Sequence, residues 1–269
     1  MAKWWHIKNQ GNKTAEVRIY GVIANEKYYE SDVTPTDFQN ELDALGDIEL
    51  LNVYINSPGG SVFAGFAIYN ILKRHKAAVA CHVDGMAASI ASVILQAGDE
   101  RVMAINGMVM IHQPMILAMG NATELRKWAD DLDKITEPII ASYTDRSTLE
   151  HDKILDMMTA ETWMTAEEAV ELGFADKVNS NSKADASAED KNVTINGITF
   201  DLSNFRNFDA SRLVTANNRN PEPNPVPAPA GTRPIARVVD PANTQEPGQR
   251  VDYKQYEDAL AKTDAILKS

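Results

Sequence analysis

Strand-like and helix-like segments alternate along residues 15–178, and this order constrains the fold more than any other feature of the sequence. Runs rich in β-branched and other apolar residues predict buried strands. Helix-starting signals such as Thr34-Pro35, with proline at the first helical position, separate these runs. The expected strands cover 17–23, 50–55, 77–83 and 109–111, and the expected helices cover 35–45, 61–72, 87–97, 122–143 and 166–172. This order predicts an α/β domain with a largely parallel sheet and right-handed crossovers.

The expected helix over 122–143 carries a long apolar stripe. Its large side chains recur at spacings of three and four residues: Leu125, Trp128, Leu132, Ile135, Ile139 and Tyr143. Residues at these spacings share one face of a helix, and an apolar face of this kind is stable only when it is covered. We therefore expect this face to pack against another surface.

The charge and the cysteine content exclude several classes of protein. The chain of 269 residues carries a net charge of −12, and such a chain is a poor nonspecific binder of nucleic acid because phosphate contacts need clustered Lys and Arg. The lone Cys81 excludes an internal disulfide and a multi-thiolate metal site. No apolar run reaches the roughly 18 residues of a membrane helix, and the first residues lack the pattern of a secretory leader. We expect a cytoplasmic protein with no membrane or nucleic-acid partner.

The amino-acid composition of the chain changes after Val178. Residues 179–191 are polar and rich in Ser and Ala, as linkers are. Two alternating runs around Asn196-Gly197 predict a hairpin. The expected organisation is a domain over 1–178 and a mostly extended appendage over 179–269, which comprises a linker (179–191), a hairpin (193–200), a Pro-rich segment (221–234) and a short C-terminal helix (253–267).

Two motifs near strand ends contain residue types that acyl-transfer chemistry uses. The run Asn56-Ser57-Pro58-Gly59-Gly60 follows an expected strand, and its glycines leave backbone N–H groups open to an anion, as in an oxyanion hole. Ser89 lies near the start of an expected helix of small residues, which leave room for a substrate carbonyl. An ordinary strand-to-helix turn and a serine that fills a packing gap are the alternatives at these two places.

His112 closes an expected apolar strand, where a neutral imidazole could take the proton of a serine hydroxyl. A core histidine bonded to the backbone is the alternative. A carboxylate usually orients such a histidine, and the acidic candidates are Asp156 and Glu161, with Trp163 able to shield Glu161 from water. A solvated surface carboxylate is the alternative for both, and the sequence leaves the choice between them open.

Four segments, in this order and spacing, resemble the proteolytic subunit of the Clp proteases. They are Tyr54–Gly60, Ala87–Ser89, Met110–Pro114 and Glu168–Gly173. Further details resemble the phage-encoded branch of this type, the head maturation (prohead) proteases: Ala64–Asn70, Glu161–Trp163 and Gly173–Asp176. The resemblance covers about residues 15–178.

The resemblance implies a ClpP/crotonase-like spiral of β-β-α units, in which the helix over 122–143 joins two stacked rings of subunits. It also implies hydrolysis through an acyl-enzyme without a metal or organic cofactor. The implied roles are Ser89 as nucleophile, His112 as general base, Glu161 as the third member where the family usually has Asp, and the N–H groups of Gly60 and Ile90 as the oxyanion hole.

The expected function is therefore that of a ring-forming serine endopeptidase that cleaves capsid or scaffold proteins during phage head maturation. One alternative is a housekeeping degradative subunit that works with an ATPase, which would be a separate chain because the sequence holds no Walker A pattern. The sequence also allows an acyl-CoA enzyme of the crotonase type, which needs no Ser89/His112 pair, and a ring-forming structural protein without activity.

Overall fold

The computed structural model describes residues 3–24 and 34–209. The expected Pro-rich segment (221–234) and C-terminal helix (253–267) lie outside these residues. No helix in the described part of the chain is long and apolar enough to cross a membrane. Among the same residues, no group of His, Cys, Asp and Glu could hold a metal ion.

The mixed α/β architecture predicted from the sequence is confirmed. In chain order the elements are β1 (Trp5–Gly11), β2 (Thr14–Tyr20), α1 (Pro35–Asp43), β3 (Leu50–Ser57), α2 (Val62–Arg74), β4 (Ala78–Ala88), α3 (Ile90–Leu95), β5 (Glu100–Ala104), β6 (Met108–Ile111), α4 (Ala122–Thr144), α5 (His151–Thr159), β7 (Thr162–Thr165), α6 (Ala166–Glu171), β8 (Lys177–Asn179), β9 (Ala186–Glu189), β10 (Asn192–Ile195) and β11 (Ile198–Asp201).

Most strands form one eight-stranded sheet, the large sheet, along the path β1-β2-β3-β4-β5-β8. All pairs from β2 to β8 on this path are parallel, and β1 is antiparallel at the edge. The long strand β4 pairs with two strands along one side: Ala80–Val83 pairs with β5, and Met86–Ala88 pairs with β6. β7 adds to β6 in antiparallel orientation. The carboxyl ends of β3, β4 and β6 therefore meet at one edge of the sheet, where ligands bind in open parallel sheets.

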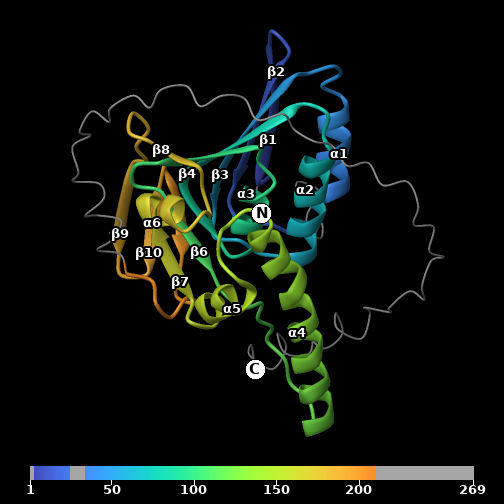
Figure 1. The fold of residues 1–269 in the computed structure, drawn as a ribbon, viewed down its shortest axis with the longest axis vertical. Helices are drawn as coiled ribbons and strands as arrows, with labels where there is room; N and C mark the ends of the chain where they lie inside the picture. Colours follow the sequence, from blue (N-terminus) through green and yellow to red (C-terminus); the bar gives the residue numbers. More distant parts are fainter. Residues whose placement is uncertain (1–2, 25–33, 210–269) are drawn as a thin grey trace, which may run out of the picture. The chain divides into compact units, whose positions relative to one another are not determined.

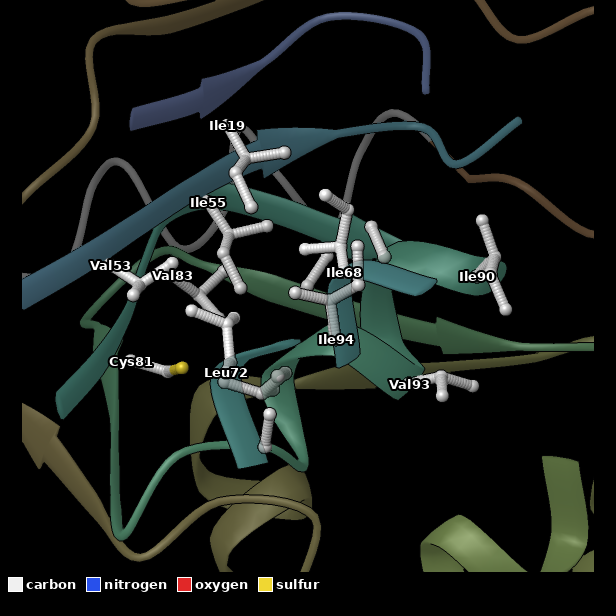
Figure 2. Close-up of a cluster of buried hydrophobic side chains, with 14 of the residues drawn as sticks. Ile19, Val53, Ile55, Ile68, Leu72, Cys81, Val83, Ile90, Val93 and Ile94 are labelled. Atoms are coloured by element: carbon white, nitrogen blue, oxygen red, sulfur yellow. The ribbon is translucent and has the colours of Figure 1, made fainter. Parts of the chain in front are cut away.

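The hydrophobic core lies between the large sheet and the helices α1, α2 and α3 (Figure 1). In Figure 2, Ile19, Ile55 and Val83 of three neighbouring strands point toward Ile68 of α2 and Ile94 of α3. Each of these side chains is almost fully buried, and burial of one such side chain stabilises a fold by roughly 1.5–3 kcal/mol. This packing fixes the strands that end at the site.

The helix starts follow local sequence rules. Thr34 caps α1 in a capping box with Asp37, and Thr165 caps α6 in the same way with Glu168. The predicted helix over 87–97 is wrong at its start, because β4 continues through Ala88 and α3 begins only at Ile90. Alanine favours helix locally, but backbone pairing with β3 and β6 overrides that preference here.

The chain after β8 forms a three-stranded antiparallel sheet, the small sheet, in the order β11-β10-β9. The predicted hairpin is confirmed, with Asn196 and Gly197 at positive φ in the turn. The linker interpretation of 179–191 is wrong in part, because Ala186–Glu189 pairs with β10. Side chains of the small sheet and of the segment after it pack against β4, β6 and β7 in a second apolar cluster: Met86, Ala88, Met108, Met110, Trp163, Ala184, Val193, Ile195, Phe200, Leu202, Phe205 and Phe208.

The predicted long helix is confirmed as α4, and its second half is buried through Ile139, Ile140 and Tyr143. Residues 115–131, which include the first half of α4, belong to a separate compact unit of the chain. Large apolar side chains are exposed along that stretch: Met115, Ile116, Leu117, Met119 and Leu125. Within the described residues, other parts of the chain thus cover only the second half of the apolar stripe.

Candidate active site

Ser89 follows directly on β4, at the point where the strand ends and α3 begins. Ala88 pairs with Met110 of β6, and the Ser89 N–H donates to the Met110 carbonyl at 2.9 Å. Ser89 has a φ of 55°, a left-handed conformation that costs on the order of 1–3 kcal/mol in a residue other than glycine. Buried Ser92 fixes this backbone further, because its hydroxyl donates to the Ser89 carbonyl at 2.5 Å. These contacts fix the Ser89 backbone at the end of β4, next to β6.

His112 follows directly on β6, the parallel neighbour of β4. Because the carboxyl ends of parallel neighbours meet at the same edge, the two side chains come together. The distance between Ser89 Oγ and His112 Nε2 is 2.8 Å, which is within hydrogen-bond reach of a general base. Of the other histidines, His82 contacts Asn52 and His151 contacts Glu137, so neither has a serine partner.

The surroundings of His112 favour its neutral form. Burial lowers the pKa of the imidazole, the nearby Glu161 carboxylate acts to raise it, and the Arg206 cation acts to lower it. The net direction is downward, which favours the neutral ring. With its proton on Nδ1, a neutral ring accepts at Nε2 and can take the Ser89 proton.

The glycines after β3 approach Ser89 closely. Gly59 and Gly60 have φ values of 97° and 145°, which L side chains rarely adopt. A Cβ on Gly59 would lie 2.6 Å from Ser89 Cβ, and a Cβ on Gly60 would lie 2.1 Å from the Ile23 carbonyl oxygen. Within the described residues, the N–H groups of Gly60 and Ile90 have no hydrogen-bond acceptor, so both are available to a developing oxyanion.

Glu161 lies beside His112 because of the antiparallel register of β6 and β7. Ile111 pairs with Thr162, which sets Glu161 opposite His112. Glu161 is only 5% exposed and has a φ of 51°. Its carboxylate accepts hydrogen bonds from the indole of Trp163 and from the backbone N–H groups of Arg206 and Asn207. No hydrogen bond joins Glu161 to His112 in the described part of the chain.

The other acidic candidate, Asp156, lies on α5 and is exposed. Of the two carboxylates that the sequence left open, Glu161 is the one that acts on the charge of His112. Trp163 is buried next to Glu161 as expected, and it shields one side of the carboxylate from water.

Sequence reasoning missed the contribution of residues 205–208 to this site. The Phe205 ring contacts the His112 ring edge-on at 5.8 Å between centroids, and Arg206 and Asn207 bind Glu161 through their backbone. The available signal was the apolar spacing of Leu202, Phe205 and Phe208 directly after the predicted hairpin, which indicates a packed segment rather than a tail.

The sequence model of the Clp protease family matches residues 15–182. This chain belongs to the Clp protease family. Family relatives include ATP-dependent Clp protease proteolytic subunits of Bacteroides thetaiotaomicron, 40% identical over 51% of this chain and 63% of the relative, and of Bacteroides fragilis, 40% identical over 51% of this chain and 67% of the relative. The protein of the same name from Deinococcus radiodurans is 34% identical over 55% of this chain and 74% of the relative.

The family match contains all of the predicted site residues, Gly60, Ser89, Ile90, His112 and Glu161. The chain spans just under two thirds of the length of the Bacteroides thetaiotaomicron relative. The match ends at residue 182, before the small sheet. None of the relatives named above is a phage protein, so they favour the housekeeping alternative over phage head maturation.

Proposed function

We propose that this chain is a serine-type endopeptidase with Ser89 as nucleophile and His112 as general base. The observation that carries the proposal is the 2.8 Å distance between Ser89 Oγ and His112 Nε2, beside two backbone N–H groups free of acceptors among the described residues. These are the parts that acyl transfer requires: a nucleophile, a base in contact with it, and donors for an oxyanion. Glu161 is the proposed third member, and Gly60 and Ile90 are the proposed oxyanion donors.

In the proposed reaction, Ser89 Oγ attacks the carbonyl carbon of a peptide bond while its proton passes to His112 Nε2. The oxyanion that forms accepts from the N–H groups of Gly60 and Ile90. His112 then gives the proton to the leaving amine, and the acyl-enzyme remains on Ser89. A water molecule then gives a proton to His112 as its oxygen attacks the acyl carbon. When the bond to Ser89 Oγ breaks, His112 returns this proton to Oγ and the carboxylic acid product is released. The negative charge of Glu161 stabilises the imidazolium during both proton transfers.

The proposed setting is a housekeeping, ring-forming degradative subunit in the cytoplasm that takes protein substrates. The named relatives are described as ATP-dependent proteolytic subunits, and the present sequence contains no Walker A pattern. An ATPase would therefore be a separate partner. The exposed apolar side chains on 115–125 offer a surface for contacts between subunits.

Phage head maturation is the second candidate. The observation in its favour is that the chain runs well beyond the family match at residue 182, since a long appendage suits an enzyme that binds assembly partners or trims its own tail. Loss of the tail in wild-type protein but not in Ser89→Ala, followed by mass spectrometry, would favour this setting.

A fluorophosphonate probe tests the proposed chemistry, because it reacts covalently with activated serines. Wild-type protein is expected to be labelled at Ser89, and Ser89→Ala is expected to fold normally and to lose all labelling. Ser203→Ala, which removes an exposed serine after β11, is the matched control and should be labelled as well as wild type. Labelling of Ser89→Ala at another serine would exclude Ser89, and unlabelled wild type would favour a structural ring protein.

A further inference from the structure

The carboxylate of Glu161 is held by backbone from outside the family match. The Arg206 N–H donates to Oε2 at 3.0 Å, and the Asn207 N–H donates to Oε1 at 2.8 Å. The Trp163 indole adds a longer bond of 3.3 Å to Oε1. A buried carboxylate is stable only with such donors, and two of the three come from the segment that follows the small sheet.

This segment is itself fixed at several points. Lys191, in the turn between β9 and β10, donates to the carbonyls of Phe205 and Phe208, both at 3.1 Å. The side-chain amide of Asn207 donates to the Ala160 carbonyl at 2.6 Å. The two N–H groups therefore reach Glu161 from a backbone that is anchored on both sides, which gives them a defined direction.

Aromatic rings close the space around these hydrogen bonds. Phe205 contacts both His112 and Trp163, with centroid distances of 5.8 and 5.7 Å. Phe208 contacts Trp163 at 5.0 Å. The Phe205 ring thus packs between His112 and Trp163, which binds Glu161, and an electrostatic interaction is stronger where apolar groups replace water.

We propose that residues Phe205–Phe208, the Glu161 clamp, are positioning residues that hold the Glu161 carboxylate beside His112. The inference rests on the proposed function, since it assigns the clamp to the same site. Glu161 has a longer side chain than the Asp that the resemblance leads one to expect at this position, so its carboxylate has one more rotatable bond to restrain. The backbone donors of Arg206 and Asn207 supply that restraint.

The clamp acts on catalysis through charge. Two charged groups of the described chain act on His112 in opposite directions: the Glu161 carboxylate favours the protonated ring, and the Arg206 cation disfavours it. When His112 takes the Ser89 proton, the fixed carboxylate stabilises the positive charge that forms. A carboxylate released from the clamp can rotate toward solvent, which weakens this stabilisation.

The test removes one backbone donor from the full-length chain. Asn207→Pro abolishes the N–H that binds Oε1, whereas Asn207→Ala keeps that N–H and removes only the side-chain bond to Ala160. Asn207→Ala is therefore the matched control. For both variants we would measure the second-order rate of fluorophosphonate labelling between pH 5 and 9, together with the circular dichroism spectrum.

The labelling rate of Asn207→Pro is expected to fall on the order of 10- to 100-fold below that of Asn207→Ala, as displacement of a catalytic group by about 1 Å does. The acidic limb of its pH profile is expected to move to lower pH, because His112 loses part of the charge that favours protonation. In a Glu161→Gln background the proline substitution should cause no further shift of the limb, since the clamp then has no carboxylate to hold.

Two results would overturn the inference. Equal rates and equal pH profiles for Asn207→Pro and Asn207→Ala would show that the clamp does not act on the site. A faster rate, with the limb moved to higher pH, would show that the clamp holds Glu161 away from His112 and inhibits the enzyme.

If Asn207→Pro does not fold, Arg206→Pro removes the other donor and is compared with Arg206→Ala. Titration of the His112 ring by NMR reads the same shift without activity. Failure of the proposed function gives a different result, because Ser89→Ala would then still be labelled. Failure of the clamp inference appears only in the comparison of each proline variant with its alanine control.

Discussion

The large and small sheets contribute to the same site in different ways. In the large sheet, β3, β4 and β6 are parallel and their carboxyl ends carry Gly60, Ser89 and His112. The small sheet is antiparallel, and within the described residues its large buried side chains are Val193, Ile195 and Phe200. It contributes no side chain to the Ser89–His112 pair, but Lys191 in its β9–β10 turn donates to the carbonyls of Phe205 and Phe208 in the segment that binds Glu161.

The two parts of the site are therefore positioned by different interactions. The Ser89–His112 distance follows from strand register, which the whole hydrophobic core maintains. The position of the Glu161 carboxylate follows from a few hydrogen bonds to a segment outside the family match. We therefore expect changes in the small sheet to leave the contact between Ser89 and His112 intact and to alter the pKa of His112.

The largest effect is expected where the two sheets meet, at Glu161. Glu161→Gln should lower kcat/KM for a peptide substrate on the order of 100-fold, since it removes the charge that stabilises the imidazolium. It should also lower the pKa of His112, because the carboxylate acts to raise that pKa. His112 then stays neutral at lower pH, so the acidic limb of the profile moves downward.

Asp156→Asn is the matched control for this change, because it removes an exposed carboxylate on α5. A loss in Asp156→Asn equal to that in Glu161→Gln would contradict the assignment of the third member.

A smaller effect is expected from glycines in the two sheets. Gly197 has a φ of 79° with open space around it, so Gly197→Ala should destabilise the small sheet by about 1–2 kcal/mol through backbone strain alone. Hydrogen exchange at the amides of β10 and β11 would measure this loss of stability, and fluorophosphonate labelling should stay nearly unchanged.

Gly60→Ala changes the large-sheet side of the site. A Cβ there would lie 2.1 Å from the Ile23 carbonyl oxygen and would displace the backbone, so fluorophosphonate labelling should fall. Equal labelling losses in the two variants would break the distinction between the sheets.

The smallest effect is expected from the charge of Arg206. The Arg206 cation acts to lower the pKa of His112, so Arg206→Gln should raise that pKa and move the acidic limb of kcat/KM to higher pH. The backbone bond to Glu161 remains in this variant, so the maximal rate should stay close to that of wild type. Arg206→Lys keeps the charge and should keep the wild-type profile; a shifted profile in the lysine variant would mean that the effect is not one of charge.

Much of the fold could be predicted because local patterns and tertiary packing agree. The Thr34 and Thr165 caps and the Asn196-Gly197 turn form where the sequence indicates, and so does the strand expected over 50–55. The strand expected over 17–23 also forms, but it runs from Thr14 to Tyr20. Ala87 and Ala88 show where this agreement ends. Their helix preference is outweighed by pairing with β3 and β6, and no local pattern reports the presence of a strand partner far away in the chain.

The sequence likewise indicates some residues of the candidate site and not others. Ser89 and His112 could be singled out because each lies at the end of an apolar run, and their spatial contact follows once the strands are parallel neighbours. The choice of Glu161 over Asp156 depends on the register of β6 and β7, which the sequence does not specify. The donors of Arg206 and Asn207 are backbone groups, so no residue type marks them.

The place of the clamp at the end of the described chain has a consequence for biosynthesis. A ribosome releases Ser89 and His112 well before it has made Lys191 and the Phe205–Phe208 segment that Lys191 anchors. A nascent subunit can therefore fold its large sheet while Glu161 still lacks two of its hydrogen-bond donors. In the proposed enzyme, the restraint on Glu161 is therefore completed only after the strands that carry Ser89 and His112 have been made.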